Sequence, residues 1–230
     1  KETQKSLFTI FNNTDYFKVH SALPSMERFA DEGAANHTRL CRNYDSNGVG
    51  LFVYGRDRES DLLKFSFPAR QTLEASQAIA RQHNLLDGHA IYLQQSSRAI
   101  NAGAFHNDVV AVGNGPVLFY HQHAYETKSL TLAFGKLKEL MPFKAIEVPA
   151  DKVSLNDAIT SYLFNSQLLA GPNGDMDKMC LIAPSECFDN EAVRSYLAQL
   201  VEDRSQPIRH VEYVDVRQSM SNGGGPACLR

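Results

Sequence analysis

A cysteine that could act as a nucleophile lies near the end of the sequence, after a run of glycines. Cys228 follows residues 223–225, which are all glycine, with one proline and one alanine between them. Consecutive glycines are costly to order, and such a loop is usually kept where the backbone must approach a ligand or adopt a positive φ. The alternative is a flexible linker that ends in a buried thiol, because free cysteine is among the most buried residue types. Partners elsewhere in the sequence must decide between these interpretations.

An imidazole and a carboxylate lie two residues apart in the segment 103–108. The pattern predicts a loop that enters a strand at this point. On an extended backbone, positions 106 and 108 face the same side, so one ligand could meet both His106 and Asp108. This combination favours a general base beside an anionic anchor. The alternative is a surface histidine next to a turn-forming Asn-Asp pair.

A second acidic candidate is Glu32, within the segment 31–37. Taken alone, this segment is more typical of a solvated helix cap followed by small residues. His121 and His123 could present two imidazoles on one face of a strand, but no third ligand follows at a recognisable spacing. The sequence therefore favours a solvent-facing strand end over a metal site. Cys180 and Cys187 are too far apart for a CxxC clip, and we expect both to be inert thiols.

The elements that must position these residues alternate between strands and helices. Apolar and β-branched runs predict strands, and turn residues such as Gly, Asn and Pro separate them. Strand pairs and single helices alternate with a period of roughly 40 to 60 residues, which indicates a repeated unit and an α/β fold. The expected strands are 17–23, 50–54, 90–93, 108–112, 117–120, 145–148, 162–169, 179–183 and 211–216, and the expected helices are 70–83, 129–140 and 190–200.

The composition is that of a folded, water-soluble domain. The 230 residues carry a formal net charge of -3, with 43% hydrophobic and 21% charged residues. This balance disfavours a nucleic-acid partner and intrinsic disorder, and no apolar run approaches the length of a membrane helix. Four irregularly spaced cysteines and a polar start predict a reducing, cytoplasmic location. The lack of an initial Met and the strand-like last residues suggest that both ends are cuts in a longer protein.

Seven motifs are spread over nearly the whole chain. They are VHSALP at 19–24, DEGAANH at 31–37, LFVYGR at 51–56, PARQT at 68–72, FHNDV at 105–109, YLFNSQLL at 162–169 and SNGGGPACLR at 221–230. Together and in this order, they resemble the succinylarginine dihydrolase family, which belongs to the pentein, or guanidine-modifying, superfamily.

The resemblance implies a role for each candidate residue. Cys228 matches the nucleophile, His106 the general acid/base and Glu32 the carboxylate that completes the catalytic set. The matched substrate-binding positions are Arg70, Asp108 and Asn222. The implied reaction converts N2-succinyl-L-arginine and water to N2-succinyl-L-ornithine, two ammonia and carbon dioxide, in arginine catabolism by the succinyltransferase pathway. No metal and no cofactor is implied, and the family leaves a homodimer open.

The resemblance also implies a fold, a closed propeller of ββαβ units around a pseudo-fivefold axis. Family members are considerably longer than this chain, so residues 1–230 are expected to be part of a single catalytic domain that is incomplete at both ends. Two alternatives stay open. One is a deiminase or dihydrolase that acts on another guanidine, and the other is a pentein that binds without catalysis, since a fold does not fix a function.

Overall fold

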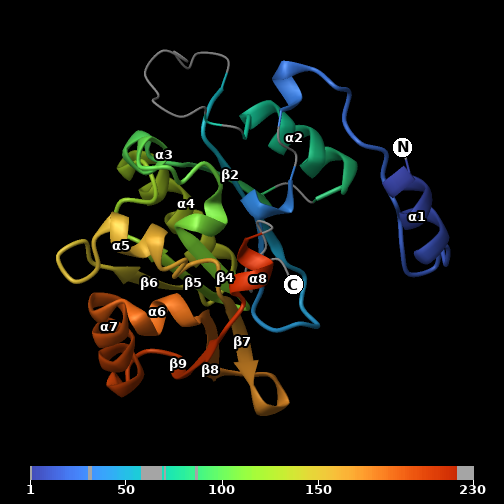
Figure 1. Ribbon diagram of the computed structural model, residues 1–230. Coiled ribbons are helices and arrows are strands. Elements are labelled where there is room, and N and C mark those ends of the chain that lie inside the picture. Colours follow the sequence, from blue (N-terminus) through green and yellow to red (C-terminus); the bar gives the residue numbers. More distant parts are fainter. Residues whose placement is uncertain (1, 31–32, 58–68, 70, 86–87, 222–230) are drawn as a thin grey trace.

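The computed structural model describes residues 2–30, 33–57, 69, 71–85 and 88–221. Within these residues the strands form three sheets of three strands each (Figure 1). In every sheet the first two strands are antiparallel and the third is parallel to the second. A helix precedes the third strand each time, because a parallel pair needs a crossover connection. The chain thus repeats one strand–strand–helix–strand unit three times, and the alternation expected from the sequence is confirmed.

Unit 1 consists of β1 (His37–Leu40), β2 (Val49–Tyr54), α2 (Leu73–Gln82) and β3 (Ala90–Gln94). The central strand β2 is almost entirely apolar, since it is covered on both faces. Helix α2 starts three residues later than the sequence suggested, because the Thr72 side chain accepts a hydrogen bond from the backbone N–H of Ala75 at 3.2 Å and caps the helix.

Unit 2 consists of β4 (Ala111–Asn114), β5 (Val117–His121), α4 (Thr127–Leu140) and β6 (Lys144–Val148). The turn between β4 and β5 favours a glycine because Gly115 has a φ of 56°. The Met176 side chain of the next unit lies against it, with Sδ 2.5 Å from where a Cβ would be. The expected antiparallel pair is therefore present, and its turn packs against unit 3.

Unit 3 consists of β7 (Gln167–Gly171), β8 (Asp175–Pro184), α6 (Ser185–Asp189), α7 (Glu191–Glu202) and β9 (Ile208–Val214). Asn190 caps α7 as predicted, because its side chain accepts a hydrogen bond from the Val193 N–H at 3.1 Å. The other described helices are α1 (Glu2–Ile10), α3 (Ser97–Asn101), α5 (Leu155–Thr160), α8 (Arg217–Met220) and the 3-10 turns η1 (Glu27–Phe29), η2 (Ala34–Asn36), η4 (Asn107–Val109) and η5 (Pro172–Gly174).

The three units follow one another in space, from unit 1 at the top of Figure 1 to unit 3 in orange and red at the bottom. Their first strands are neighbours, since β1 contacts β4 and β4 contacts β7. Asn114 at the end of β4 joins both neighbours, because its Nδ2 donates to the hydroxyl of Tyr44 and to the carbonyl of Leu168, both at 2.8 Å. The first strands of the three units thus lie next to one another, with β4 between β1 and β7.

Two large apolar clusters hold the units together. One lies between units 1 and 2, and the other between units 2 and 3. The rings of Phe119 in β5 and Phe164, both fully buried, lie 5.1 Å apart in the second cluster. Such contacts bury apolar surface between units rather than within one unit, so each unit depends on its neighbours for stability.

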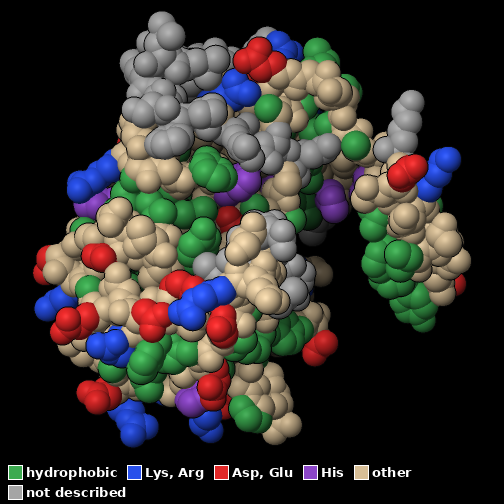
Figure 2. Space-filling view, viewed as in Figure 1, with side chains coloured by type: hydrophobic (Ala, Val, Ile, Leu, Met, Phe, Trp, Pro, Cys, Tyr) green, Lys and Arg blue, Asp and Glu red, His purple; other side chains and the backbone are tan. Residues whose placement is uncertain are grey.

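The surface in Figure 2 mixes Lys and Arg with Asp and Glu over unit 3, which fits the small net charge of -3. Helix α1 stands to one side of the three units and has no buried residue (Figures 1 and 2). None of the described helices is long and apolar enough to cross a membrane.

Three expected elements differ from the structure. Residues 17–23 form no strand. The strand expected from Asp108 begins only at Ala111, because residues 107–109 turn into η4. Residues 162–166 form a turn, buried from Leu163 to Ser166, and only Gln167 starts β7, because Tyr162 adopts a φ of 55°, in the left-handed region, which interrupts an extended backbone.

Removing the Phe119 ring should destabilise the fold, because this ring packs in the apolar cluster between units 2 and 3. Phe119→Ala leaves a cavity beside Phe164, and we expect the free energy of unfolding to fall by about 3–5 kcal/mol. Urea denaturation followed by circular dichroism measures this change. Leu132→Ala, at a position that is 61% exposed on α4, is the control and should change stability by less than about 0.5 kcal/mol. Equal losses in the two variants would contradict the assignment of the core.

Candidate active site

His106 and Asp108 flank the first residue of the turn η4, just before unit 2. His106 is half-buried and has an extended backbone, with φ -129° and ψ 154°, whereas Asp108 lies inside the 3-10 turn and is only 8% exposed. The Phe105 ring lies edge-on to the imidazole, with the ring centroids 5.1 Å apart. The expectation that an extended strand places both side chains on one face is wrong, because the backbone turns at Asn107.

The Asn36 side chain joins three segments that are far apart in the sequence. Its Nδ2 donates to Oε1 of Gln71, and its Oδ1 accepts from the backbone N–H of Asn107, both at 2.9 Å. Asn36 is fully buried and Gln71 is 2% exposed. Because the amide oxygen accepts from one segment and the amide nitrogen donates to another, the orientation of this side chain is fixed. Asn36 lies four residues after Glu32, Gln71 follows Arg70, and Asn107 follows His106.

Asn107 is held on its other side by Tyr125. The Tyr125 hydroxyl donates to Oδ1 of Asn107 at 2.6 Å, and the tyrosine is 5% exposed. Burial, followed by the nearby Tyr120, raises the pKa of Tyr125 well above its ordinary value. Tyr125 therefore keeps its proton and remains a donor at neutral pH, so the residue between His106 and Asp108 is fixed through both its backbone and its side chain.

Gln71 fixes the end of β2 beside the start of α2. Its Nε2 donates to Oγ of Ser76 at 3.1 Å and lies 3.2 Å from Nε2 of His37. Its backbone carbonyl accepts from the N–H groups of Gly55 and Arg56. With Asn36, these contacts satisfy the buried amide completely, as a buried polar group requires.

Asn165, in the turn that leads into unit 3, reaches the same place. Its Nδ2 donates to Oδ2 of Asp108 at 3.3 Å, and Asn165 is 9% exposed. Four of the motifs that carried the family resemblance are thus joined by buried side chains. The four residues that join them carry no functional signal of their own in the sequence, although each lies inside one of the family motifs: Asn36, Gln71, Asn107 and Asn165.

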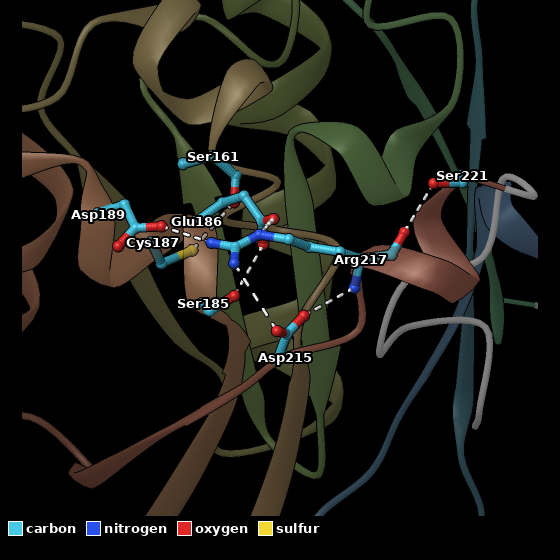
Figure 3. A network of polar contacts seen from close by, with 8 residues as sticks. All are labelled: Ser161, Ser185, Glu186, Cys187, Asp189, Asp215, Arg217 and Ser221. Atoms are coloured by element: carbon cyan, nitrogen blue, oxygen red, sulfur yellow. Dashed lines mark hydrogen bonds and ion pairs between the residues drawn. The ribbon is translucent and has the colours of Figure 1, made fainter.

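Helix α8, at the end of the described chain, is anchored to unit 3 by Arg217 (Figure 3). The guanidinium of Arg217 lies 2.9 Å from Glu186 and 2.7 Å from Asp189 of α6, and 3.7 Å from Asp215. The hydrogen bond to Glu186 is the main cause that raises the pKa of Arg217. Exposed ion pairs are individually weak, but three carboxylates around one guanidinium fix where α8 lies. Residues 222–230 follow directly, and they include Asn222 and Cys228.

Glu32, Arg70, Asn222 and Cys228 lie outside the described residues. Of the six predicted site residues, the structure therefore places His106 and Asp108. It also places Gln71 and Ser221, which are adjacent in the sequence to Arg70 and Asn222, and Asn36, which lies four residues after Glu32.

The surroundings of Cys180 and Cys187 do not favour a thiolate. Cys187 is fully buried, and its Sγ lies 3.2 Å from the carbonyl oxygen of Ser161 (Figure 3). Burial raises the pKa of Cys187 to about 12 and is also the main cause that raises the pKa of Cys180. Both thiols stay protonated at neutral pH, which agrees with their expected inertness.

His121 is structural, and the expectation of a solvent-facing strand end is wrong. The side chain is fully buried, its Nε2 lies 3.0 Å from the Val153 carbonyl, and its Nδ1 accepts from the His123 N–H at 3.0 Å. The carbonyl can only accept, so Nε2 carries the proton and both ring nitrogens are occupied. Among the described residues, no group of three or more His, Cys, Asp or Glu side chains could hold a metal ion.

Sequence similarity to known proteins shows which family the chain belongs to. The family model for succinylarginine dihydrolase matches residues 1–230. The chain belongs to this family. It is 52% identical to the N-succinylarginine dihydrolase of Idiomarina loihiensis over 228 residues, covering 97% of this chain and 50% of that protein. It is 53% identical to that of Hahella chejuensis over 232 residues, covering 99% and 51%. The chain thus spans about half the length of the curated relatives it matches.

Solved structures show a similar fold at low sequence identity. The N-terminal domain of ArgZ, a cyanobacterial arginine dihydrolase bound to its product, superposes with a TM-score of 0.57 at 16% identity. The match covers 100% of this chain and 64% of that one. A structure of the same domain covalently bound to a reaction intermediate has a TM-score of 0.55. These likenesses support the repeated α/β fold that the strand order already indicates.

Asn36→Ala should destabilise this family member more than an ordinary surface change. The substitution leaves the Gln71 amide oxygen and the Asn107 N–H buried without their partner, and each such group costs about 1–3 kcal/mol. We expect a loss of about 2–5 kcal/mol in the free energy of unfolding, measured by urea denaturation. Asn156→Ala, at an exposed position of α5, should change it by less than about 0.5 kcal/mol. A similarly small loss in Asn36→Ala would show that the amide contributes little.

Stability should fall in mild acid because of His121. Burial is the main cause that lowers the pKa of His121 in the folded chain, so below about pH 6.5 the unfolded chain binds more protons and is favoured. His121→Gln keeps a donor for the Val153 carbonyl and removes this titration. Denaturation between pH 7 and 5 should therefore show a smaller loss of stability in the variant. The pKa values of His83 and His123 are also lowered, chiefly by burial. These two residues should therefore leave some dependence of the free energy of unfolding on pH in the variant. Identical slopes in both proteins would refute the role of His121.

Proposed function

We propose that the full-length protein hydrolyses N2-succinyl-L-arginine. The products are N2-succinyl-L-ornithine, two ammonia and carbon dioxide, and two waters are consumed. The observation that carries this proposal is the convergence of four family motifs on Asp108 and on the residue after His106, through the buried contacts of Asn36, Gln71, Tyr125 and Asn165. Family membership over residues 1–230 supports the same reaction.

The substrate chemistry explains why these residue types are needed. A guanidinium is charged and resonance-stabilised, so it is a poor electrophile. In the proposed mechanism, Asp108 binds guanidinium N–H groups by charge-assisted hydrogen bonds and places the central carbon near Sγ of Cys228. The thiolate of Cys228 attacks this carbon, and His106 protonates the ammonia that leaves. The result is an amidino-thioether bound to the enzyme.

Water completes the first cycle. His106, now neutral, activates a water that attacks the same carbon, and the C–S bond breaks to leave a ureido group on the substrate. A second attack by Cys228 expels the second ammonia, and hydrolysis releases a carbamate that decomposes to carbon dioxide and the amine. Glu32 orients the imidazole and stabilises its protonated form. No step of the proposed reaction uses a metal or a cofactor.

The rest of the substrate needs its own contacts. Arg70 is proposed to bind a carboxylate of the succinyl or amino-acid part in a bidentate pair, with Asn222 as a further contact. This would select the succinylated substrate over free arginine. Gln71, which is fixed by Asn36 and Ser76, would hold the backbone next to Arg70 in place.

We further propose that the three units belong to a closed propeller of five ββαβ units, within a single catalytic domain. The support is the identical strand order of the three units, the adjacency of their first strands and the likeness to the ArgZ domain. The chain covers about half of its relatives, so the remaining units would come from other parts of the protein.

Ammonia stoichiometry tests the proposed reaction. The purified full-length protein, incubated with N2-succinyl-L-arginine, should release two ammonia for each N2-succinyl-L-ornithine, measured by an enzymatic ammonia assay and mass spectrometry. One ammonia and a ureido product would indicate a deiminase instead. No ammonia, together with measurable binding, would indicate a binding protein.

Cys228→Ala should abolish turnover while substrate binding survives, because the nucleophile forms the covalent intermediate. His106→Ala should lower kcat more than it changes KM, since its proton transfers act in the transition state. Steady-state kinetics and calorimetric titration of the full-length variants measure both effects. Cys187→Ala serves as the thiol control and should retain turnover, because this cysteine is buried in unit 3. Near-normal turnover in Cys228→Ala would remove Cys228 from the mechanism.

A further inference from the structure

Asn165 carries a buried acceptor that no described residue uses. Its side-chain oxygen is among three buried polar side-chain atoms in the described part of the chain that have no hydrogen-bond partner. The residue is 9% exposed, so water reaches it poorly. A buried acceptor without a donor is costly, and each such case in a folded protein calls for an explanation.

The orientation of the amide is determined by its neighbour. Nδ2 of Asn165 lies 3.3 Å from Oδ2 of Asp108. An ionised carboxylate can only accept, so the amide nitrogen must face Asp108 and the amide oxygen must face away from this contact. The Asn165 amide is therefore held against the Asp108 carboxylate by its nitrogen, and its oxygen is a second acceptor on the residue next to that carboxylate.

The backbone around Asn165 is held in a conformation that is unfavourable in isolation. Tyr162 has a φ of 55°, which residues other than glycine rarely adopt. The turn is fixed by hydrogen bonds from the Leu163 N–H to the Ala158 carbonyl, at 3.1 Å, and from the Ser166 hydroxyl to the Leu163 carbonyl, at 2.6 Å. A strained turn persists only when its surroundings determine it, and such turns are concentrated at ligand-binding sites.

We propose that Asn165 is a substrate-binding residue whose Oδ1 accepts a hydrogen bond from the guanidinium group that Asp108 binds. The inference rests on the proposed function. A substituted guanidinium has five N–H donors in one plane, and a single carboxylate can accept only two of them in a bidentate pair. An adjacent amide oxygen supplies a further acceptor. Such an oxygen needs no cationic donor, so the same contact is available to the neutral ureido group that remains after the first ammonia has left.

The test compares a ligand that has the guanidinium with one that lacks it. Asn165→Ala and the similarly sized Asn165→Leu are made in the full-length protein. Turnover of N2-succinyl-L-arginine gives kcat/KM, and inhibition by N2-succinyl-L-norvaline gives the affinity for the same chain without the guanidinium. Loss of an acceptor for a charged donor should lower kcat/KM by at least about tenfold in both variants, with the inhibition constant of the norvaline compound unchanged.

Asn190→Ala is the matched control, because Asn190 Nδ2 also donates to a carboxylate oxygen, Oδ1 of Asp157 in α5, at 2.9 Å. It should lower the unfolding temperature and leave both ligand constants unchanged. Equal weakening of both ligands, or no change in either, in the Asn165 variants would overturn the inference and leave the proposed function intact. A wild-type protein that releases no ammonia from N2-succinyl-L-arginine would overturn the proposed function and this inference with it.

Discussion

A single buried amide, that of Asn36, holds together three segments on which the site depends. It donates to Gln71 and accepts from the backbone of Asn107, so it joins unit 1 to the turn that begins unit 2. Each contact is fixed in direction, because the amide has one donor end and one acceptor end. Arg70, His106 and Asp108 are each adjacent in the sequence to a residue of these contacts, so the groups that hold this region in place differ from the groups proposed to bind or react.

Two further side-chain contacts join other segments of the chain to this region and to unit 3. Asn165, in the turn before β7, reaches Asp108 in the turn before unit 2 through a buried contact, and Arg217 fixes α8 to α6. The Ser161 carbonyl accepts from the buried Cys187 thiol, next to the Glu186 that holds Arg217 (Figure 3). The turn that contains Asn165 and the helix before the last residues of the chain are therefore anchored to the same small helix. This shared anchor can hold the turn and α8, which are far apart in the sequence, in fixed positions relative to each other.

The sequence predicted the repeated unit because its signals are local. Apolar strands, the Asn190 cap and the turn around Gly115 depend on neighbouring residues, and they appear at or near the expected positions. The position of Asp108 in a 3-10 turn and the burial of His121 were not predictable, because contacts with other units decide them. Asn36 showed no signal of its own, since a buried amide bridge is defined only by partners that lie 35 and 71 residues away.

Hydrogen exchange of the Asn107 backbone amide tests the central claim most directly. This N–H is bonded to Asn36 inside the structure, so in the folded full-length protein it should exchange only through large-scale unfolding. Its protection, measured by NMR or by mass spectrometry of short peptides, should match that of the core strand β5 and fall sharply in Asn36→Ala. Rapid exchange of Asn107 in the unmodified protein, at a rate typical of exposed loops, would contradict the account.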